Sequence, residues 1–304
     1  MGAAREATQR MTTVNKAVIP AAGWGTRLLP ATKAIPKEMV TVLDRPAIQW
    51  AVEEAVGAGL DDLCIVTSRS KSAIEDHFDA APELEAALES CNKLEVLQAV
   101  RRTATLARIH YTRQASALGL GHAIAQAAQH VGGDPFAVLL PDVVMDPGSP
   151  TLAELVGAHG RTGASVLALI EVPEEQVSLY GCVAVEAVEG DDTLVRIVGV
   201  VEKPAPSEAP SNLTVVGRYV LTRSVMDALE TTAPSAGGEI QLTDAIASVI
   251  EGGEPVYGLT VDSGVVHDTG SVLGLLEANL AFGLADSEIG PPLRRLLEQR
   301  GVRD

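Results

Sequence analysis

Residues 16–46 read KAVIPAAGWGTRLLPATKAIPKEMVTVLDRP and contain the most informative pattern in the chain. The apolar run at residues 17–19 predicts a strand, which leads directly into the glycine-rich turn Gly23-Trp24-Gly25-Thr26-Arg27. Such a turn leaves backbone N–H groups free to face a phosphate. Lys33 and Lys37 follow closely enough to neutralise the phosphate's charge. The stretch therefore predicts a polyphosphate site at the end of the first strand.

Two common nucleotide-binding loops do not match this turn. A Walker A loop ends in Gly-Lys-Ser/Thr, whereas this turn ends in Gly-Thr-Arg. A dinucleotide fingerprint needs a third glycine where Leu28 stands, so a dehydrogenase is disfavoured. Taken alone, the two glycines also fit an ordinary strand-to-loop turn beside a basic surface. The reaction class therefore depends on the rest of the chain.

The first half of the chain alternates between strand-like and helix-like segments. Apolar runs predict strands at residues 16–20, 63–67, 109–112 and 136–141, and helical patterns lie at residues 46–59, 83–106 and 120–131. This alternation predicts an α/β fold with a mixed, mostly parallel central sheet flanked by helices. In such sheets ligands bind at the carboxyl ends of the strands, where residues 20–23 and Pro141-Asp142 fall.

The second half is richer in strands. Val-rich segments predict strands at residues 165–172, 182–188, 195–201 and 214–221, and helices are expected at residues 241–251, 272–284 and 293–300. There is neither an internal repeat nor a low-complexity linker. We expect a flexible leader at residues 1–13, one catalytic domain at residues 14–270, and a C-terminal helical extension at residues 271–304 within the same globule.

Composition narrows the partners and the setting. The net charge of −17 disfavours nucleic acid and anionic membranes, and no apolar run approaches the roughly 20 residues that span a bilayer. An acidic protein that binds an anionic nucleotide must concentrate positive charge locally, with help from a metal ion. The three scattered cysteines and the polar N-terminus indicate neither a disulfide framework nor a secretion signal, so we expect a cytoplasmic protein.

Two aspartates are candidate metal ligands. Asp142 follows the buried run at residues 136–140, which places a carboxylate at a strand end where Mg²⁺ and substrate phosphates are bound in this kind of fold. Asp268, in the sequence His267-Asp268-Thr269-Gly270, offers a second carboxylate. Each aspartate could instead be a helix cap or a turn residue.

Three further segments are candidate ligand contacts. Glu202-Lys203 ends a Val-rich run, so the lysine could reach a phosphate while the glutamate accepts hydrogen bonds from sugar hydroxyls. The alternative is an exposed ion pair of little energetic weight. Gly181 would let a ligand approach the backbone. Gln114 and the segment Gly119-Leu120-Gly121 form a second candidate loop before a helix.

These segments resemble, in the same order, the sugar-nucleotide pyrophosphorylase family in its branch of bacterial UTP–glucose-1-phosphate uridylyltransferases. The matching motifs span residues 16–285 and are AAGWGTR (21–27), PATK (30–33), PKE (36–38), Gln114 with GLGHA (119–123), LPD (140–142), Tyr180-Gly181, VEKP (201–204), GRY (217–219), GGEIQLTDA (237–245) and HDTG (267–270). So many ordered motifs do not arise by chance.

The resemblance implies a Rossmann-like nucleotidyltransferase fold, transfer of a uridylyl group from UTP to glucose 1-phosphate, Mg²⁺ as cofactor, and a homodimer or homotetramer. It implies the following roles by position: Arg27, Lys37, Asp142 and Lys203 as catalytic residues; Ala21, Ala22, Gly23, Gly25, Thr26, Glu38, Gln114 and Gly119 for the nucleotide; Gly181, Glu202 and Val216 for the sugar; Asp142 and Asp268 for the metal. Since uracil N3–H is a hydrogen-bond donor, a carboxylate at Glu38 is a suitable acceptor.

Some positions depart from the family pattern. Val272 stands where many relatives carry a lysine, Trp24 where they usually have leucine, and Gly274-Leu275 where they have Gly-Tyr. These differences leave the sugar preference open. The alternatives are another hexose 1-phosphate, dTTP as the nucleotide, or a catalytically silent protein that binds sugar nucleotides.

Overall fold

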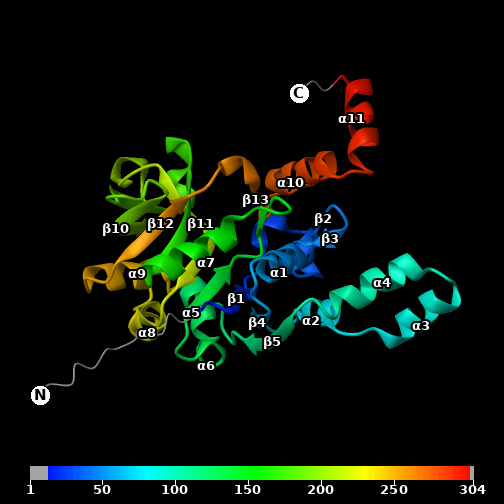
Figure 1. The fold of residues 1–304 in the computed structure, drawn as a ribbon, viewed down its shortest axis with the longest axis horizontal. Helices are drawn as coiled ribbons and strands as arrows, with labels where there is room; N and C mark the ends of the chain where they lie inside the picture. The colour runs from blue at the N-terminus through cyan, green and yellow to red at the C-terminus, as the bar shows by residue number, and fades with distance from the viewer. Residues whose placement is uncertain (1–12, 302–304) are drawn as a thin grey trace, which may run out of the picture.

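The computed structural model describes residues 13–301, so all but the last residue of the expected leader, residues 1–13, lies outside the described residues. A nine-stranded mixed sheet forms the centre, with helices on both faces (Figure 1). In spatial order its strands are β5 (Arg108–Arg113), β4 (Asp62–Thr67), β1 (Lys16–Pro20), β6 (Phe136–Leu139), β11 (Leu213–Leu221), β8 (Ser165–Glu171), β12 (Val256–Thr260), β10 (Leu194–Glu202) and β9 (Gly181–Ala187).

Parallel and antiparallel pairing divide this sheet. Strands β5, β4, β1 and β6 run parallel, as the alternation with helices predicts. From β11 onward the pairs are antiparallel, apart from the parallel pair of β8 and β12. The expected mixed sheet is confirmed, and its parallel character is concentrated in the N-terminal half. Short connections such as residues 188–193 between β9 and β10 permit antiparallel neighbours there, whereas parallel neighbours need a crossover.

Four short strands, eleven α-helices and six short 3₁₀-helices complete the described part. The strands form two pairs, β2 (Thr41–Val42) with β3 (Arg45–Pro46) and β7 (Val143–Met145) with β13 (Val266–Asp268). The helices are α1 (Ala47–Gly57), α2 (Ser72–Phe78), α3 (Pro82–Ser90), α4 (Leu94–Thr103), α5 (Leu120–Ala125), α6 (Ala128–Val131), α7 (Thr151–Thr162), α8 (Arg223–Thr231), α9 (Leu242–Glu251), α10 (Val272–Ala285) and α11 (Gly290–Gln299). None of the described helices is both long and apolar enough to cross a bilayer.

Burial on both faces explains the continuous apolar run of β1. Ala17 and Ile19 belong to the core cluster on one face, while Val18 belongs to the cluster on the other. Successive strand side chains point to opposite faces, so a strand covered on both sides must be apolar throughout. The glycine-rich turn that follows is thereby fixed to a rigid central strand.

Two predicted helices are interrupted. The helix expected at residues 83–106 is two helices, α3 and α4, which project from the sheet as a hairpin (Figure 1). Asn92 between them has φ 55°, a left-handed conformation that ends a helix and that asparagine tolerates. The helix expected at residues 120–131 is likewise divided into α5 and α6.

A buried arginine joins the sheet to α1. Arg218 on β11 is fully buried, and its guanidinium Nη2 lies 2.7 Å from Glu54 Oε2 on α1. The same guanidinium donates to the carbonyl oxygens of Leu140 (3.0 Å) and Val143 (2.7 Å). These carbonyls flank Pro141-Asp142 on either side, so Arg218 holds the turn that carries Asp142.

We expect Glu54→Gln to lower the free energy of unfolding by about 3–5 kcal/mol, because it leaves the buried Arg218 charge uncompensated. Urea denaturation with linear extrapolation measures the change. The matched control is Asp227→Asn, which removes an exposed partner of Arg223 on α8 and should leave stability close to wild type. If both substitutions have equally small effects, the Arg218–Glu54 pair does not hold this turn.

Candidate active site

A cavity of about 530 Å³ opens at the carboxyl ends of the parallel strands. Most residues predicted to contact ligand line it: Ala22, Gly23, Gly25, Thr26, Lys37, Gln114, Gly119, Asp142, Gly181, Glu202 and Lys203. Its volume is typical of sites for small molecules and cofactors. The structure thus brings together residues from six separate parts of the chain around one space.

The glycine-rich turn and Lys37 pack closely against each other. Gly25 has φ 65°, and a Cβ at this position would lie 2.8 Å from Lys37 Cβ. The hydroxyl of Thr32 donates to the Gly25 carbonyl at 2.8 Å, which holds the turn from its other side. Glycine is therefore required here both for its backbone conformation and for the space that the lysine stem occupies.

A network of four charged side chains lies at one end of the cavity. Lys37 Nζ donates to Asp142 Oδ2, and Arg27 lies 3.9 Å from Asp142 and 3.4 Å from Asp268. Asp268 comes close because β13 pairs with β7, placing Asp268 opposite Val143. Two carboxylates 126 positions apart in the sequence thus converge through the fold, with Arg27 between them.

Both members of the Lys37–Asp142 pair are charged at neutral pH. Burial is the largest single effect on Asp142 and acts to raise its pKa, but attraction to Lys37 and Arg27 and the hydrogen bonds to the carboxylate together hold this pKa below its usual range. Burial is also the largest single effect on Lys37 and acts to lower its pKa, but attraction to Asp142 and Glu38 and the hydrogen bond to Asp142 together raise it. The result is an ionised carboxylate beside the cavity, the form in which aspartate binds metal ions.

The Glu38 side chain lies outside the cavity, although the resemblance assigns it to uracil. It is fully buried, and both of its carboxylate oxygens accept hydrogen bonds from Lys71 Nζ, at 3.0 and 2.8 Å. Burial raises the pKa of Glu38 and lowers the pKa of Lys71. Lys71 also donates to the Ala21 carbonyl at 2.7 Å, so this pair supports the glycine-rich turn from behind.

The second loop closes the cavity on the opposite side. Gln114 Nε2 donates to the Gly119 carbonyl at 3.0 Å and lies 2.9 Å from His122 Nδ1. Gly119 has φ 96°, and a Cβ there would lie 2.8 Å from the Ile240 carbonyl oxygen. Gly121 N–H donates to that carbonyl at 2.9 Å. The loop therefore depends on glycine for its close approach to residues 239–241.

Glu202 and Lys203 lie on a third wall. Lys203 Nζ is 3.3 Å from Glu202 Oε1, and Thr243 Oγ1 donates to Glu202 Oε2 at 3.1 Å. Lys203 adopts φ 45°, a left-handed conformation that is uncommon outside glycine and concentrates at functional sites. Gly181 lies beside them, and a Cβ there would come within 2.9 Å of Thr243 Cγ2.

Val216 does not line the cavity. Its side chain belongs to the core cluster on the other face of the sheet, whereas Val215 lines the cavity. Alternation along β11 explains why two adjacent valines point to opposite faces. Of the other predicted residues, Ala21 is buried behind the turn, and Arg27 and Asp268 lie at the rim beside Asp142.

Several lining residues have no role assigned from the sequence. Tyr180, Tyr219, Glu239, Leu242 and Thr243 all face the cavity, as does Trp24, which is 78% exposed. Thr243 and Tyr219 each lie within a motif that matches the family, but a motif does not show which of its side chains face the ligand. Lys71 lies in none of the motifs that match the family. Its contact with Glu38 forms only when the chain folds, so the residues alone gave no indication of it.

A strand-anchored glycine turn, paired cations and converging carboxylates are typical of proteins that handle nucleoside triphosphates. The chain belongs to the Nucleotidyl transferase family, whose pattern it matches over residues 16–283. One relative is the UTP–glucose-1-phosphate uridylyltransferase of Staphylococcus epidermidis, 46% identical over 96% of this chain and 100% of the relative.

Two solved structures are similar throughout. The UTP-bound UGPase from Acinetobacter baumannii has a TM-score of 0.86 and 42% identity, over 94% of this chain and 99% of that one. A UDP-glucose pyrophosphorylase complexed with UDP-glucose has a TM-score of 0.78 and 37% identity, over 90% and 100% of the respective chains. The Rossmann-like nucleotidyltransferase fold expected from the sequence is thereby confirmed.

Proposed function

We propose that this nucleotidyltransferase transfers a uridylyl group from UTP to glucose 1-phosphate, giving UDP-glucose and pyrophosphate. The main support for the proposal is the arrangement of charged side chains around the cavity. Arg27, Lys37, Asp142 and Asp268 lie together at one end. Lys203 lines a separate wall. A relative with 46% identity is named for this reaction, and similar structures contain UTP or UDP-glucose.

The chemistry needs positioning and charge rather than a strong base. Glucose 1-phosphate is already ionised at neutral pH, so its phosphate oxygen can attack the α-phosphorus of UTP directly. The new bond joins that oxygen to the α-phosphorus, and the bond to the β-phosphate breaks, so pyrophosphate leaves with the electron pair. We assign Arg27 and Lys37 to the triphosphate and Lys203 to the sugar phosphate, where cations stabilise the charge that develops.

We propose Asp142 and Asp268 as the ligands of Mg²⁺. Their oxygens suit a hard cation, and Asp142 is held ionised by Lys37. When bound, Mg²⁺ neutralises charge on the triphosphate. Arg27 contacts both carboxylates, and its side chain is 60% exposed, so it is free to turn toward a phosphate.

Base recognition is assigned to Gln114 and Gly119. The Gln114 amide nitrogen is already bound to the Gly119 carbonyl, which directs the nitrogen away from a base and leaves Oε1 to accept uracil N3–H. Cytosine lacks a proton at N3 and would be rejected. The buried Glu38 then acts through Lys71, which supports the glycine-rich turn. Gly181, Glu202 and the backbone near Val216 are assigned to the sugar.

We also propose that the catalytic domain at residues 14–270 assembles as a homodimer or homotetramer through the C-terminal extension, residues 271–304. Support comes from α10, where Val272, Leu273, Leu276 and Leu280 are exposed on one helix.

We propose a cytoplasmic setting for the protein. The three cysteines, Cys64, Cys91 and Cys182, are all free, which supports this proposal.

Pyrophosphate release from a panel of nucleoside triphosphates and hexose 1-phosphates tests the reaction. We expect release only with UTP and glucose 1-phosphate in the presence of Mg²⁺, and none in EDTA. Turnover with dTTP or another hexose 1-phosphate would reassign the substrate while keeping the mechanism. Nucleotide binding without release for any pair would instead indicate a silent binding protein and contradict the proposal.

Lys203→Ala tests the sugar-phosphate role. We expect kcat/KM to fall about 10²–10³-fold, equivalent to about 3–4 kcal/mol of transition-state stabilisation. Lys93→Ala removes an exposed lysine that does not line the cavity and serves as the control. A Lys203→Ala enzyme within about threefold of wild type would show that this residue does not bind the phosphate.

Leu276→Glu tests the assembly. A charge on the exposed face of α10 should convert the oligomer to a smaller species in light scattering, since it would be desolvated without a partner in an apolar interface. Leu84→Glu, at another exposed leucine, on α3, is the control and should leave the mass unchanged. A wild-type monomer, or an oligomer that survives Leu276→Glu, would rule out this surface.

A further inference from the structure

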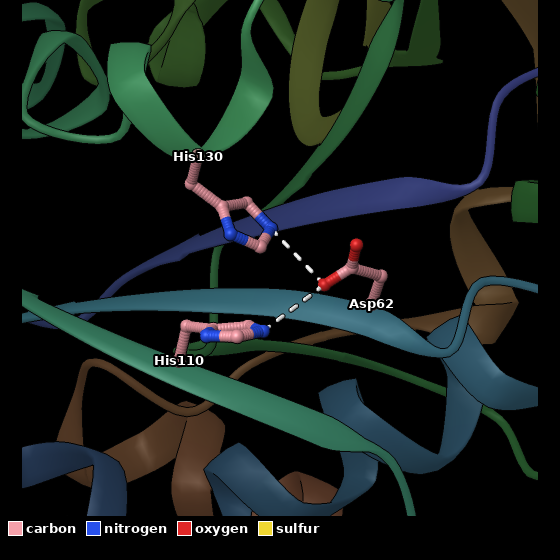
Figure 2. A group of neighbouring side chains, drawn as sticks. All are labelled: Asp62, His110 and His130. Carbon is pink, nitrogen blue, oxygen red and sulfur yellow. Dashed lines mark ion pairs between the residues drawn. The ribbon is translucent and has the colours of Figure 1, made fainter.

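Three potential metal-binding side chains converge away from the cavity. Asp62 comes from the start of β4, His110 from β5 and His130 from α6, and all three point toward one another (Figure 2). The Oδ1 atom of Asp62 lies 3.4 Å from His110 Nε2 and 3.4 Å from His130 Nε2. None of the three lines the substrate cavity.

The sheet register explains this convergence. Strands β4 and β5 are parallel, with Asp62 opposite Arg108 and Cys64 opposite His110. Asp62 and His110 are thus two positions apart along paired strands and lie on the same face. Helix α6 covers that face, since its Val131 shares a core cluster with Cys64. The cluster lies toward the amino end of β4, whereas the cavity opens at the carboxyl ends.

Hydrogen bonding leaves this cluster unsatisfied. Asp62 Oδ1 and His130 Nε2 are both buried atoms, and neither has a hydrogen-bond partner among residues 13–301. Their separation of 3.4 Å exceeds the usual 2.7–3.2 Å of an N–H···O bond. Buried polar atoms are rarely left without partners. A bound ion that contacts both atoms is therefore the simplest explanation for two unpaired atoms that face each other.

The spacing matches donors around a metal ion. An ion about 2.0–2.1 Å from imidazole nitrogen and about 2.0–2.2 Å from carboxylate oxygen, with tetrahedral angles, keeps neighbouring donors about 3.3–3.5 Å apart. Both measured N···O distances fall in this range, and all three donor atoms lie within 4.8 Å of one another. The His110 side chain is 59% exposed, which leaves it room to adjust.

The electrostatics also suit a cation. Lys16 is one nearby positive charge, and its ammonium donates hydrogen bonds to the Val131 carbonyl at 3.0 Å and to Asp134 at 2.9 Å. Asp134 therefore offsets the cation that would otherwise repel a metal ion.

We propose that Asp62, His110 and His130 bind one divalent transition-metal ion of the Zn²⁺ class through one carboxylate oxygen and two imidazole nitrogens. Two nitrogens and one oxygen select such ions over Mg²⁺, which prefers oxygen ligands alone. A water molecule completes the coordination, because the protein supplies three donors. The ion links α6 to the strands β4 and β5 and stabilises this edge of the sheet, separately from the catalytic cation.

The test is a titration of the full-length protein, stripped with EDTA and returned to excess Mg²⁺ so that oxygen-only sites are filled. Co²⁺ should bind with a stoichiometry of one, give the visible absorption of a tetrahedral site, and be displaced by Zn²⁺. Either ion should raise the melting temperature by linkage. Asp62→Asn and His110→Gln should each weaken binding at least about tenfold, as expected when a ligand is lost.

Matched controls separate this site from adventitious binding. Asp61→Asn changes the adjacent exposed carboxylate, and His77→Gln changes a histidine on α2, so both should bind Co²⁺ as wild type does. Because His130 is largely buried and its substitution could unfold the protein, the test relies on the variants Asp62→Asn and His110→Gln. Absence of a Co²⁺ spectrum in wild type, or an unchanged spectrum in Asp62→Asn and His110→Gln, would overturn the proposal.

Discussion

The buried guanidinium of Arg218 is the constraint on which the candidate site depends. It joins Glu54 on α1 to the carbonyls of Leu140 and Val143, and Asp142 lies between those two residues. A charge in this position is tolerated only because a carboxylate and several carbonyl oxygens replace water around it. Satisfying the arginine therefore determines the path of the chain that presents Asp142 to the cavity.

Two lysine–carboxylate pairs on opposite sides of the glycine-rich turn have different consequences. Lys37 and Asp142 face the cavity and remain charged, because charge attraction and hydrogen bonding together outweigh the effect of burial. Glu38 and Lys71 are buried behind the turn, and burial shifts both of their pKa values toward the neutral forms. The first pair is placed to meet phosphate and metal, whereas the second supports the backbone. The molecule thus concentrates cations locally despite its net charge of −17.

Sequence patterns predicted the fold class well and single side chains less well. Strand β1 and helix α10 were predicted nearly to their observed bounds, since burial on both faces and a long, mostly apolar run leave strong signals. The break at Asn92 was missed, because helical residues continue on both sides of one left-handed position. In the candidate site, the motif residues gather around one cavity, but the sequence could not show that Val215 rather than Val216 faces it.

The features that could be predicted from the residues alone are local: the strand followed by a glycine turn, the cations after it, and motifs in family order. Such features depend on residues that are neighbours in the chain, so they can be recognised from the amino-acid sequence. Which distant groups meet depends on how the elements pack in three dimensions. Asp268 pairs with Arg27, which lies 241 positions earlier in the sequence. Lys71 donates a hydrogen bond to the carboxylate of Glu38. The register of β4 and β5 places His110 beside Asp62. These contacts arise when the sheet and its helices pack, and no local pattern encodes them.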